Sequence, residues 1–157
     1  MKTLEGYLNE AFSEAFHSVR NNIGGPFGAV IVKNNTIIGK GGNRVIEQHD
    51  PTAHAEIVAI RNACKKIESF DLSGCILYAT CEPCPMCLAA IYWANIDTVY
   101  YCSTRYDAQD IGFRDDYIYE ELGKSPENRK LHFLQVDHHR SRELFEEWKK
   151  KQDKTPY

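Results

Sequence analysis

The chain has 157 residues, 43% of them hydrophobic, and a formal net charge of −3. This length and composition are sufficient for a substantial core, and we expect residues 1–157 to form a single domain. The acidic balance provides no general positive field for phosphate groups, which disfavours nucleic acid as a partner.

In the first part of the chain, the hydrophobic pattern changes from a helical period to a strand period and back. Apolar residues at spacings of three and four predict a first helix, and two apolar runs joined by Asn34-Asn35 predict a hairpin. Asp50 or Thr52 is expected to cap a second helix, with Pro51 in its first turn. The predicted elements are a helix over 3–21, strands over 28–33 and 36–42, and a helix from residue 50 to about 66.

In the second part, a strand, a helix and another strand follow one another closely, which predicts a parallel β-α-β crossover. The predicted elements are a strand over 75–80, a helix over 85–94, a strand over 98–102, a helical or irregular stretch over 118–122, a strand over 131–136 and a helix over 142–151. Together the elements predict an α/β fold with a mixed sheet of about five strands between two layers of helices.

One histidine and two cysteines have the spacing of a metal site. His54-Ala55-Glu56 precedes Cys84-Pro85-Met86-Cys87 in the chain. Tetrahedral zinc bound by His54, Cys84 and Cys87 would keep a fourth position for water, as catalytic zinc sites do. A carboxylate at Glu56 could then relay protons between that water and a substrate. The pattern therefore predicts a catalytic zinc centre.

The predicted helices favour this arrangement under one geometric condition. Cys84 and Cys87 lie at the start of a helix, where free N–H groups and the helix dipole stabilise thiolates. His54 and Glu56 are about 200° apart on an ideal helix. They can converge only if the metal lies near the tip of their helix.

Two other interpretations of the cysteines remain open. Cys81 could complete a closed structural zinc site with Cys84, Cys87 and His54, giving a non-catalytic zinc-stabilised module. The six cysteines could instead form three disulfides, but a chain of this size does not need them. Unpaired cysteines favour a reducing compartment, and the sequence shows neither a signal peptide nor a run of about 18 apolar residues. We expect a cytoplasmic protein that does not enter the membrane.

The pattern H-x-E followed by P-C-x-x-C resembles the zinc-dependent cytidine deaminase-like superfamily. The resemblance implies a three-layer α/β/α fold, one zinc ion per chain and hydrolytic removal of an amino group from a nucleobase. Free-nucleoside cytidine deaminases usually carry Cys-Ala-Glu, which disfavours that subgroup. Bacterial tRNA adenosine deaminases and bacterial guanine deaminases both match Pro-Thr-Ala-His-Ala-Glu and Glu-Pro-Cys-Pro-Met-Cys.

Four segments resemble the guanine deaminases more than the tRNA enzymes. They are residues 24–33, residues 90–94, the loop over 107–119 and the C-terminal Tyr157. The resemblance implies that guanine is converted to xanthine and ammonia in purine catabolism or salvage, and the alternatives are a tRNA-specific adenosine deaminase or a related deaminase of aminated heterocycles. The family also suggests a homodimer, in which the C-terminal segment could reach the partner's site.

The resemblance also implies roles for residues around the metal. Guanine presents N–H donors at ring nitrogen 1 and its exocyclic amine, and an ionised carboxylate such as Asp115 only accepts. Asp115, or its neighbour Asp116, would then read the base, and Asp115 could assist Glu56 in protonating the leaving amine. The remaining expected substrate-binding residues are Asn43 for the purine carbonyl and ring nitrogen 7, Ala55, Phe27 and Trp93 as walls, and Tyr157 as a lid.

Overall fold

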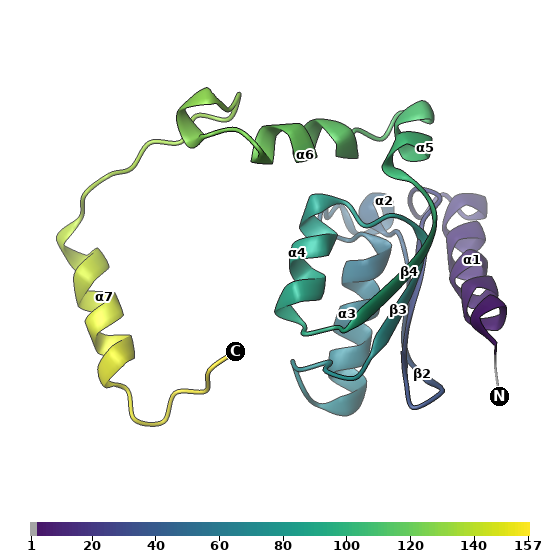
Figure 1. Cartoon of the computed structure of the whole chain (residues 1–157), viewed down its shortest axis with the longest axis horizontal. Coiled ribbons are helices and arrows are strands. Elements are labelled where there is room, and N and C mark those ends of the chain that lie inside the picture. Colours follow the sequence, from purple (N-terminus) through teal and green to yellow (C-terminus); the bar gives the residue numbers. More distant parts are fainter. Residues whose placement is uncertain (1–2) are drawn as a thin grey trace. The chain divides into compact units, whose positions relative to one another are not determined.

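A four-stranded mixed sheet organises the first of the two units into which residues 3–157, the part that the computed structural model describes, divide (Figure 1). The first unit reaches to Tyr119, and the second runs from Glu120 to Tyr157. The strand order is β2-β1-β3-β4, with β1 antiparallel to both neighbours and β3 parallel to β4. The strands are β1 (Gly28–Lys33), β2 (Thr36–Gly42), β3 (Ile76–Cys81) and β4 (Thr98–Ser103).

Helices cover both faces of this sheet, as the alternation along β1 requires. Ala29 and Ile31 belong to the larger core with α3 (Ala55–Ile67) and α4 (Pro85–Trp93). Val30 and Val32 point to the opposite face and pack with Tyr7 of α1 (Leu4–Arg20). The predicted three layers, first helix, hairpin and β-α-β crossover are therefore confirmed.

Two glycines of β2 allow α3 to lie directly on the sheet. A Cβ atom on Gly39 would lie 2.4 Å from the carbonyl oxygen of Ala59, and one on Gly41 would lie 2.3 Å from that of Ala55. Only a residue without a side chain tolerates such contacts. The close approach fixes the first turn of α3 against the end of β2.

Three short helices surround the ends of the strands. They are α2 (Val45–Gln48), α5 (Arg105–Asp110) and α6 (Asp115–Leu122). Only α6 overlaps a predicted helical stretch, and it begins earlier than expected. The start of α5 is fixed by a capping box, in which Thr104 and Asp107 each accept from the other's backbone N–H.

The second unit is poor in regular structure and contradicts one prediction. Beyond the end of α6 it contains the short 3₁₀ helix η1 (Pro126–Asn128) and α7 (His139–Lys150), which confirms the predicted last helix. The strand expected over 131–136 is wrong, so the described sheet has four strands rather than about five. A strand forms by pairing its backbone with a neighbour, and no described strand pairs with this segment. Its Leu134 and Val136 leave 86% and 82% of their surface exposed.

Among residues 3–157, no helix is both long and apolar enough to cross a membrane.

Candidate active site

His54 is the N-cap residue of α3, where the backbone is still extended (φ −69°, ψ 157°). Its side chain therefore projects from the tip of the helix, and Glu56 follows inside the first turn. Because His54 lies just outside the helix, the separation of about 200° between two residues of an ideal helix does not apply to His54 and Glu56. The predicted caps are wrong: the Thr52 backbone N–H and hydroxyl donate to Asp50 at 2.8 and 2.7 Å, closing a separate turn before α3.

Cys84 and Cys87 lie at the start of α4, on the same face of the sheet as α3. Cys84 is the N-cap residue and Cys87 is the third residue of the helix. Pro85 occupies the first helical position, where a missing N–H costs no intrahelical hydrogen bond. Free N–H groups and the positive end of the helix dipole at this turn favour negative charge on the two sulfur atoms.

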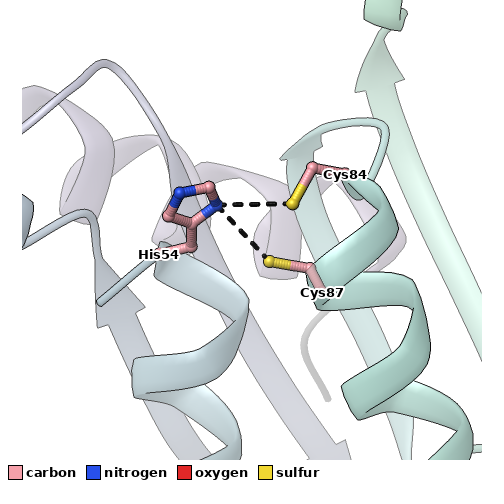
Figure 2. Close-up of side chains that lie close together, drawn as sticks. All are labelled: His54, Cys84 and Cys87. Atoms are coloured by element: carbon pink, nitrogen blue, oxygen red, sulfur yellow. Dashed lines mark hydrogen bonds between the residues drawn. The ribbon is translucent and has the colours of Figure 1, made fainter. Parts of the chain in front are cut away.

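The three predicted ligands converge with the spacing of a tetrahedral zinc site (Figure 2). His54 Nδ1 lies 3.5 Å from Cys84 Sγ and 3.6 Å from Cys87 Sγ. Bonds of about 2.0 Å to nitrogen and about 2.3 Å to sulfur at the tetrahedral angle require a nitrogen–sulfur separation of about 3.5 Å. Imidazole and thiolate are also ligands that zinc prefers. The donor set and its dimensions therefore fit one zinc ion.

The two thiols do not ionise equally. Hydrogen bonds from Cys87 and then His54 favour the thiolate of Cys84 and lower its pKa. The neighbouring Cys84, followed by burial, raises the pKa of Cys87. A divalent cation among them would favour both thiolates, so the site is suited to a metal rather than to two free sulfur anions.

Glu56 is buried beside this cluster. Burial, its largest effect, raises the pKa of Glu56 to about 7. The Cys87 thiol lies 3.4 Å from Glu56 Oε2 and donates to it. A carboxyl group that exchanges its proton near neutral pH is suited to move protons beside the metal.

A cavity of about 320 Å³ opens onto His54, Glu56 and Cys84. Its size is in the range of small-molecule sites, and its wall is predominantly apolar with a few polar groups. The remaining lining residues are Gly24, Gly25, Phe27, Asn43, Val45, Ile46, Pro51, Glu82, Phe113 and Asp115.

Asn43 lines this cavity at the end of β2 and is 4% exposed. Its side-chain oxygen accepts from the backbone N–H groups of Gly25 and Val45 at 3.1 and 3.2 Å. Because the acceptor is used, the amide NH₂ is the group that Asn43 offers to a ligand. A donor suits the two groups to which the sequence analysis matched Asn43, the purine carbonyl and ring nitrogen 7, because both are acceptors.

Asp115, the first residue of α6, also lines the cavity, and burial raises its pKa. Its neighbour Asp116 forms an ion pair with Arg114, Nε to Oδ1 3.4 Å, and does not line the cavity. Between them, the geometry favours Asp115 as the carboxylate that meets a ligand.

Aromatic rings form one wall of the cavity. Phe27 packs edge-on against Phe113, with centroids 4.7 Å apart. Sequence reasoning missed Phe113, although its position two residues before Asp115 could have drawn attention to it. Glu82 was also missed, although it lies inside the cysteine motif.

Other predicted site residues are placed differently. Ala55 is fully buried as the first residue of α3. Trp93 ends α4, is 69% exposed and is not among the described residues that line the cavity. Tyr157 belongs to the second unit and is 81% exposed. The roles of these three residues in substrate binding stay predictions.

Cys81 is separated from the ligand group. Its sulfur lies 3.5 Å from the carbonyl oxygen of Thr104, to which the thiol donates. Burial raises the pKa of Cys81 to about 12. The described metal-binding group consists of His54, Cys84 and Cys87, which leaves a coordination position for water.

Comparisons with known proteins agree with this geometry. The profile of the cytidine and deoxycytidylate deaminase zinc-binding region matches residues 1–103. The chain is 47% identical to the guanine deaminase of Bacillus subtilis (strain 168) over 98% of both proteins. The X-ray structure of a Bacillus subtilis guanine deaminase superposes with a TM-score of 0.94 over 98% of both chains, again at 47% identity. A tRNA-specific adenosine deaminase of Buchnera aphidicola is 56% identical over 71 residues, 45% of this chain and 44% of that relative.

Replacing single cysteines tests which sulfurs hold the metal. Cys84→Ala is expected to lose most of its zinc, whereas Cys81→Ala keeps about one zinc per chain, because a catalytic site needs only three protein ligands. Metal content is measured by mass spectrometry after exhaustive dialysis, with folding checked by circular dichroism. Loss of zinc from well-folded Cys81→Ala would instead indicate a closed four-ligand site.

Proposed function

Because the chain belongs to the cytidine and deoxycytidylate deaminase family, we propose that it hydrolyses guanine to xanthine and ammonia. The likeness to a guanine deaminase extends over 98% of the chain, whereas the likeness to the tRNA enzyme covers 45%. The observation that carries the proposal is the position of Asp115 on the wall of the cavity that contains His54, Cys84 and Glu56.

His54, Cys84 and Cys87 would hold the zinc ion, which when bound makes a water molecule acidic and polarises it for attack. Glu56 accepts the proton of that water and delivers it to ring nitrogen 3 while oxygen adds to carbon 2. It next takes the proton of the hydroxyl group now on carbon 2 and gives it to the amino group, so that ammonia leaves and the carbonyl of xanthine forms. Glu56 therefore acts first as a base and then as an acid, which its pKa of about 7 suits.

Two polar groups on the cavity wall are complementary to guanine. The Asp115 carboxylate accepts from ring nitrogen 1 and from the exocyclic amine. The NH₂ group of Asn43 donates to the carbonyl oxygen or ring nitrogen 7, both of which are acceptors. Adenine would present the lone pair of ring nitrogen 1 to Asp115 and would be repelled. The apolar wall that includes Phe27 and Phe113 excludes water around the ring.

Adenosine deamination in tRNA is the second candidate, and the 56% identity over 71 residues favours it. However, the cavity wall carries the carboxylates of Glu56, Glu82 and Asp115, and the chain has a net charge of −3. These charges oppose the approach of a phosphate backbone. The free base guanine carries no such charge.

The proposed setting is purine catabolism or salvage in the cytoplasm, with residues 1–157 acting as one catalytic domain. All six cysteines lie in the described part of the chain and are unpaired, which suits a reducing compartment.

We further propose a homodimer in which the C-terminal segment of each chain reaches the partner's site. The second unit exposes large apolar side chains, which folded proteins normally bury. The exposed fraction is 68% for Leu131, 57% for Phe133 and 68% for Phe145. A second chain would cover this apolar surface. Tyr157 would then contribute to a site in trans.

Glu56→Gln tests the proton relay. Ammonia release is expected to fall by about 10²–10⁴-fold, because a positioned acid–base group contributes that factor, while zinc content is retained. Release is measured with guanine, adenine, cytosine, cytidine and a tRNA anticodon stem, and exposed Glu5→Gln on α1 serves as the control. Guanine should be the preferred substrate of the wild type. Undiminished activity of Glu56→Gln would remove this residue from the mechanism.

Asp115→Asn tests recognition of the base. An amide places its NH₂ group against one of the two guanine donors, so we expect kcat/KM for guanine to fall about 100-fold, corresponding to one lost hydrogen bond to a charged group. Asp116→Asn is the matched control and should change kcat/KM little. Steady-state kinetics and a thermal melt separate recognition from folding. Normal guanine handling by Asp115→Asn would contradict the assignment.

Mixing two inactive chains tests whether the C-terminal segment works in trans. One chain lacks residues 152–157 and keeps Glu56, whereas the other is full-length Glu56→Gln. Refolded together, they are expected to regain activity, because a mixed dimer combines an intact Glu56 with the partner's intact tail. Sedimentation of the wild type should show a dimer. A mixture no more active than its two components would place the tail in its own chain's site.

A further inference from the structure

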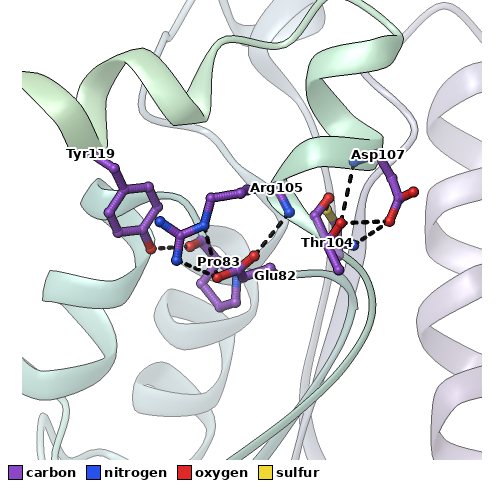
Figure 3. Close-up of polar contacts among 7 residues, drawn as sticks. Glu82, Pro83, Thr104, Arg105, Asp107 and Tyr119 are labelled. Atoms are coloured by element: carbon purple, nitrogen blue, oxygen red, sulfur yellow. Dashed lines mark hydrogen bonds and ion pairs between the residues drawn. The ribbon is translucent and has the colours of Figure 1, made fainter.

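The turn between β3 and α4 is held by an arginine outside the metal site. This turn contains Glu82 and Pro83 and delivers Cys84 to the metal (Figure 3). The Glu82 carboxylate accepts from the Arg105 backbone N–H at 2.9 Å, from its Nε at 3.1 Å and from its Nη2 at 2.6 Å. The Glu82 backbone N–H donates to the carbonyl oxygen of Ser103 at 2.8 Å. Arg105 therefore fixes the turn to the segment that follows β4.

The same arginine contacts Tyr119, which forms a second bond to the turn. The Arg105 guanidinium carbon lies 3.7 Å from the centroid of the Tyr119 ring, within the range of a cation–π contact. The Tyr119 hydroxyl donates to the carbonyl oxygen of Pro83 at 2.8 Å. As Figure 3 shows, the guanidinium lies between the Glu82 carboxylate and the tyrosine ring. The ring and its hydroxyl thus join α6 to the residue immediately before Cys84.

The position of Tyr119 along α6 gives this contact a consequence for the site. Asp115 and Tyr119 are four residues apart, so they lie on one face of the helix, about one turn from each other. Tyr119 binds the turn that carries Cys84, and Asp115 lines the cavity next to Cys84. Apolar burial holds α6 only weakly, since Ile118 leaves 44% of its surface exposed. The hydrogen bond and the cation–π contact of Tyr119 therefore restrain this face of α6.

We propose that Tyr119 is a positioning residue, which fixes Asp115 relative to the metal-binding turn through its hydrogen bond to Pro83 and its contact with Arg105. Tyr119 is not among the described residues that line the active cavity, so it acts through Asp115 rather than on the substrate. A displacement of about 1 Å at a recognition group costs up to about 100-fold in rate. This inference rests on the proposed role of Asp115 in binding guanine.

Tyr119→Phe removes a single oxygen atom and keeps the ring under the guanidinium. We expect zinc content and the melting temperature to stay close to those of the wild type, while KM for guanine rises about tenfold, the effect of one lost hydrogen bond, and kcat changes much less. Tyr106→Phe on the neighbouring α5 removes the hydroxyl of a tyrosine that is 66% exposed and should change neither constant.

A double-mutant cycle separates positioning from a general structural role. Tyr119→Phe should cause no further rise in KM when it is combined with Asp115→Asn, because the group that it positions has already lost its function. Equal losses in the wild-type background and in the Asp115→Asn background would overturn the inference, as would an unchanged KM in the single variant.

A second readout does not depend on guanine. Hydrogen exchange at the amides of residues 115–119 should be faster in Tyr119→Phe than in the wild type or Tyr106→Phe, and unchanged protection would overturn the inference. If the wild type released no ammonia from guanine, the proposed function would fall. The exchange measurement would still decide whether Tyr119 restrains α6, and the cycle would be run with the base that the wild type does deaminate.

Discussion

The site depends on two helix tips that meet over one face of the sheet. His54 is the N-cap residue of α3 and Cys84 is the N-cap residue of α4, so both ligands project from helix ends. Glycines at positions 39 and 41 let α3 lie directly on β2, which sets how closely the two tips approach. A Cβ atom at either position would lie 2.3–2.4 Å from a backbone oxygen of α3, so the helix that carries His54 would have to shift. The packing of the core and the binding of the metal are therefore one constraint.

The sequence allowed the metal ligands to be predicted because their chemistry depends on spacing within short segments. Cys84 and Cys87 lie at a helix start that Pro85 marks, and the helix and strand periods around all three ligands are clear. Helical periodicity alone would direct His54 and Glu56 to different sides of their helix. They converge because His54 is a cap residue with extended backbone, and periodicity does not determine that backbone conformation.

The features that could not be predicted depend on contacts between distant parts of the chain. The acceptor of Asn43 is occupied by Gly25, eighteen residues earlier, which no local pattern reveals. Helix α5 is only six residues long and depends on its capping box rather than on an apolar stripe. The apolar run over 131–136 has the composition of a strand, but pairing requires a neighbour that lies outside that run. The composition of residues 131–136 indicates a tendency to form a strand, but it cannot show whether another strand is available for pairing.

The roles proposed for Glu56 and Asp115 place proton transfer and recognition of the base in different parts of the chain. Glu56 belongs to the helix that carries a metal ligand, within the residues that match the family profile, 1–103. Asp115, Phe113 and Tyr119 all lie beyond that match. A zinc centre with one proton-relaying glutamate can act on different aminated rings, so it does not select among them. On the proposed assignment, selection comes from groups that meet the outer edge of the ring, and Asp115 in the segment after β4 supplies the carboxylate among them. Changes in that segment can alter the base without disturbing the metal, provided that its anchors to the cysteine turn are kept.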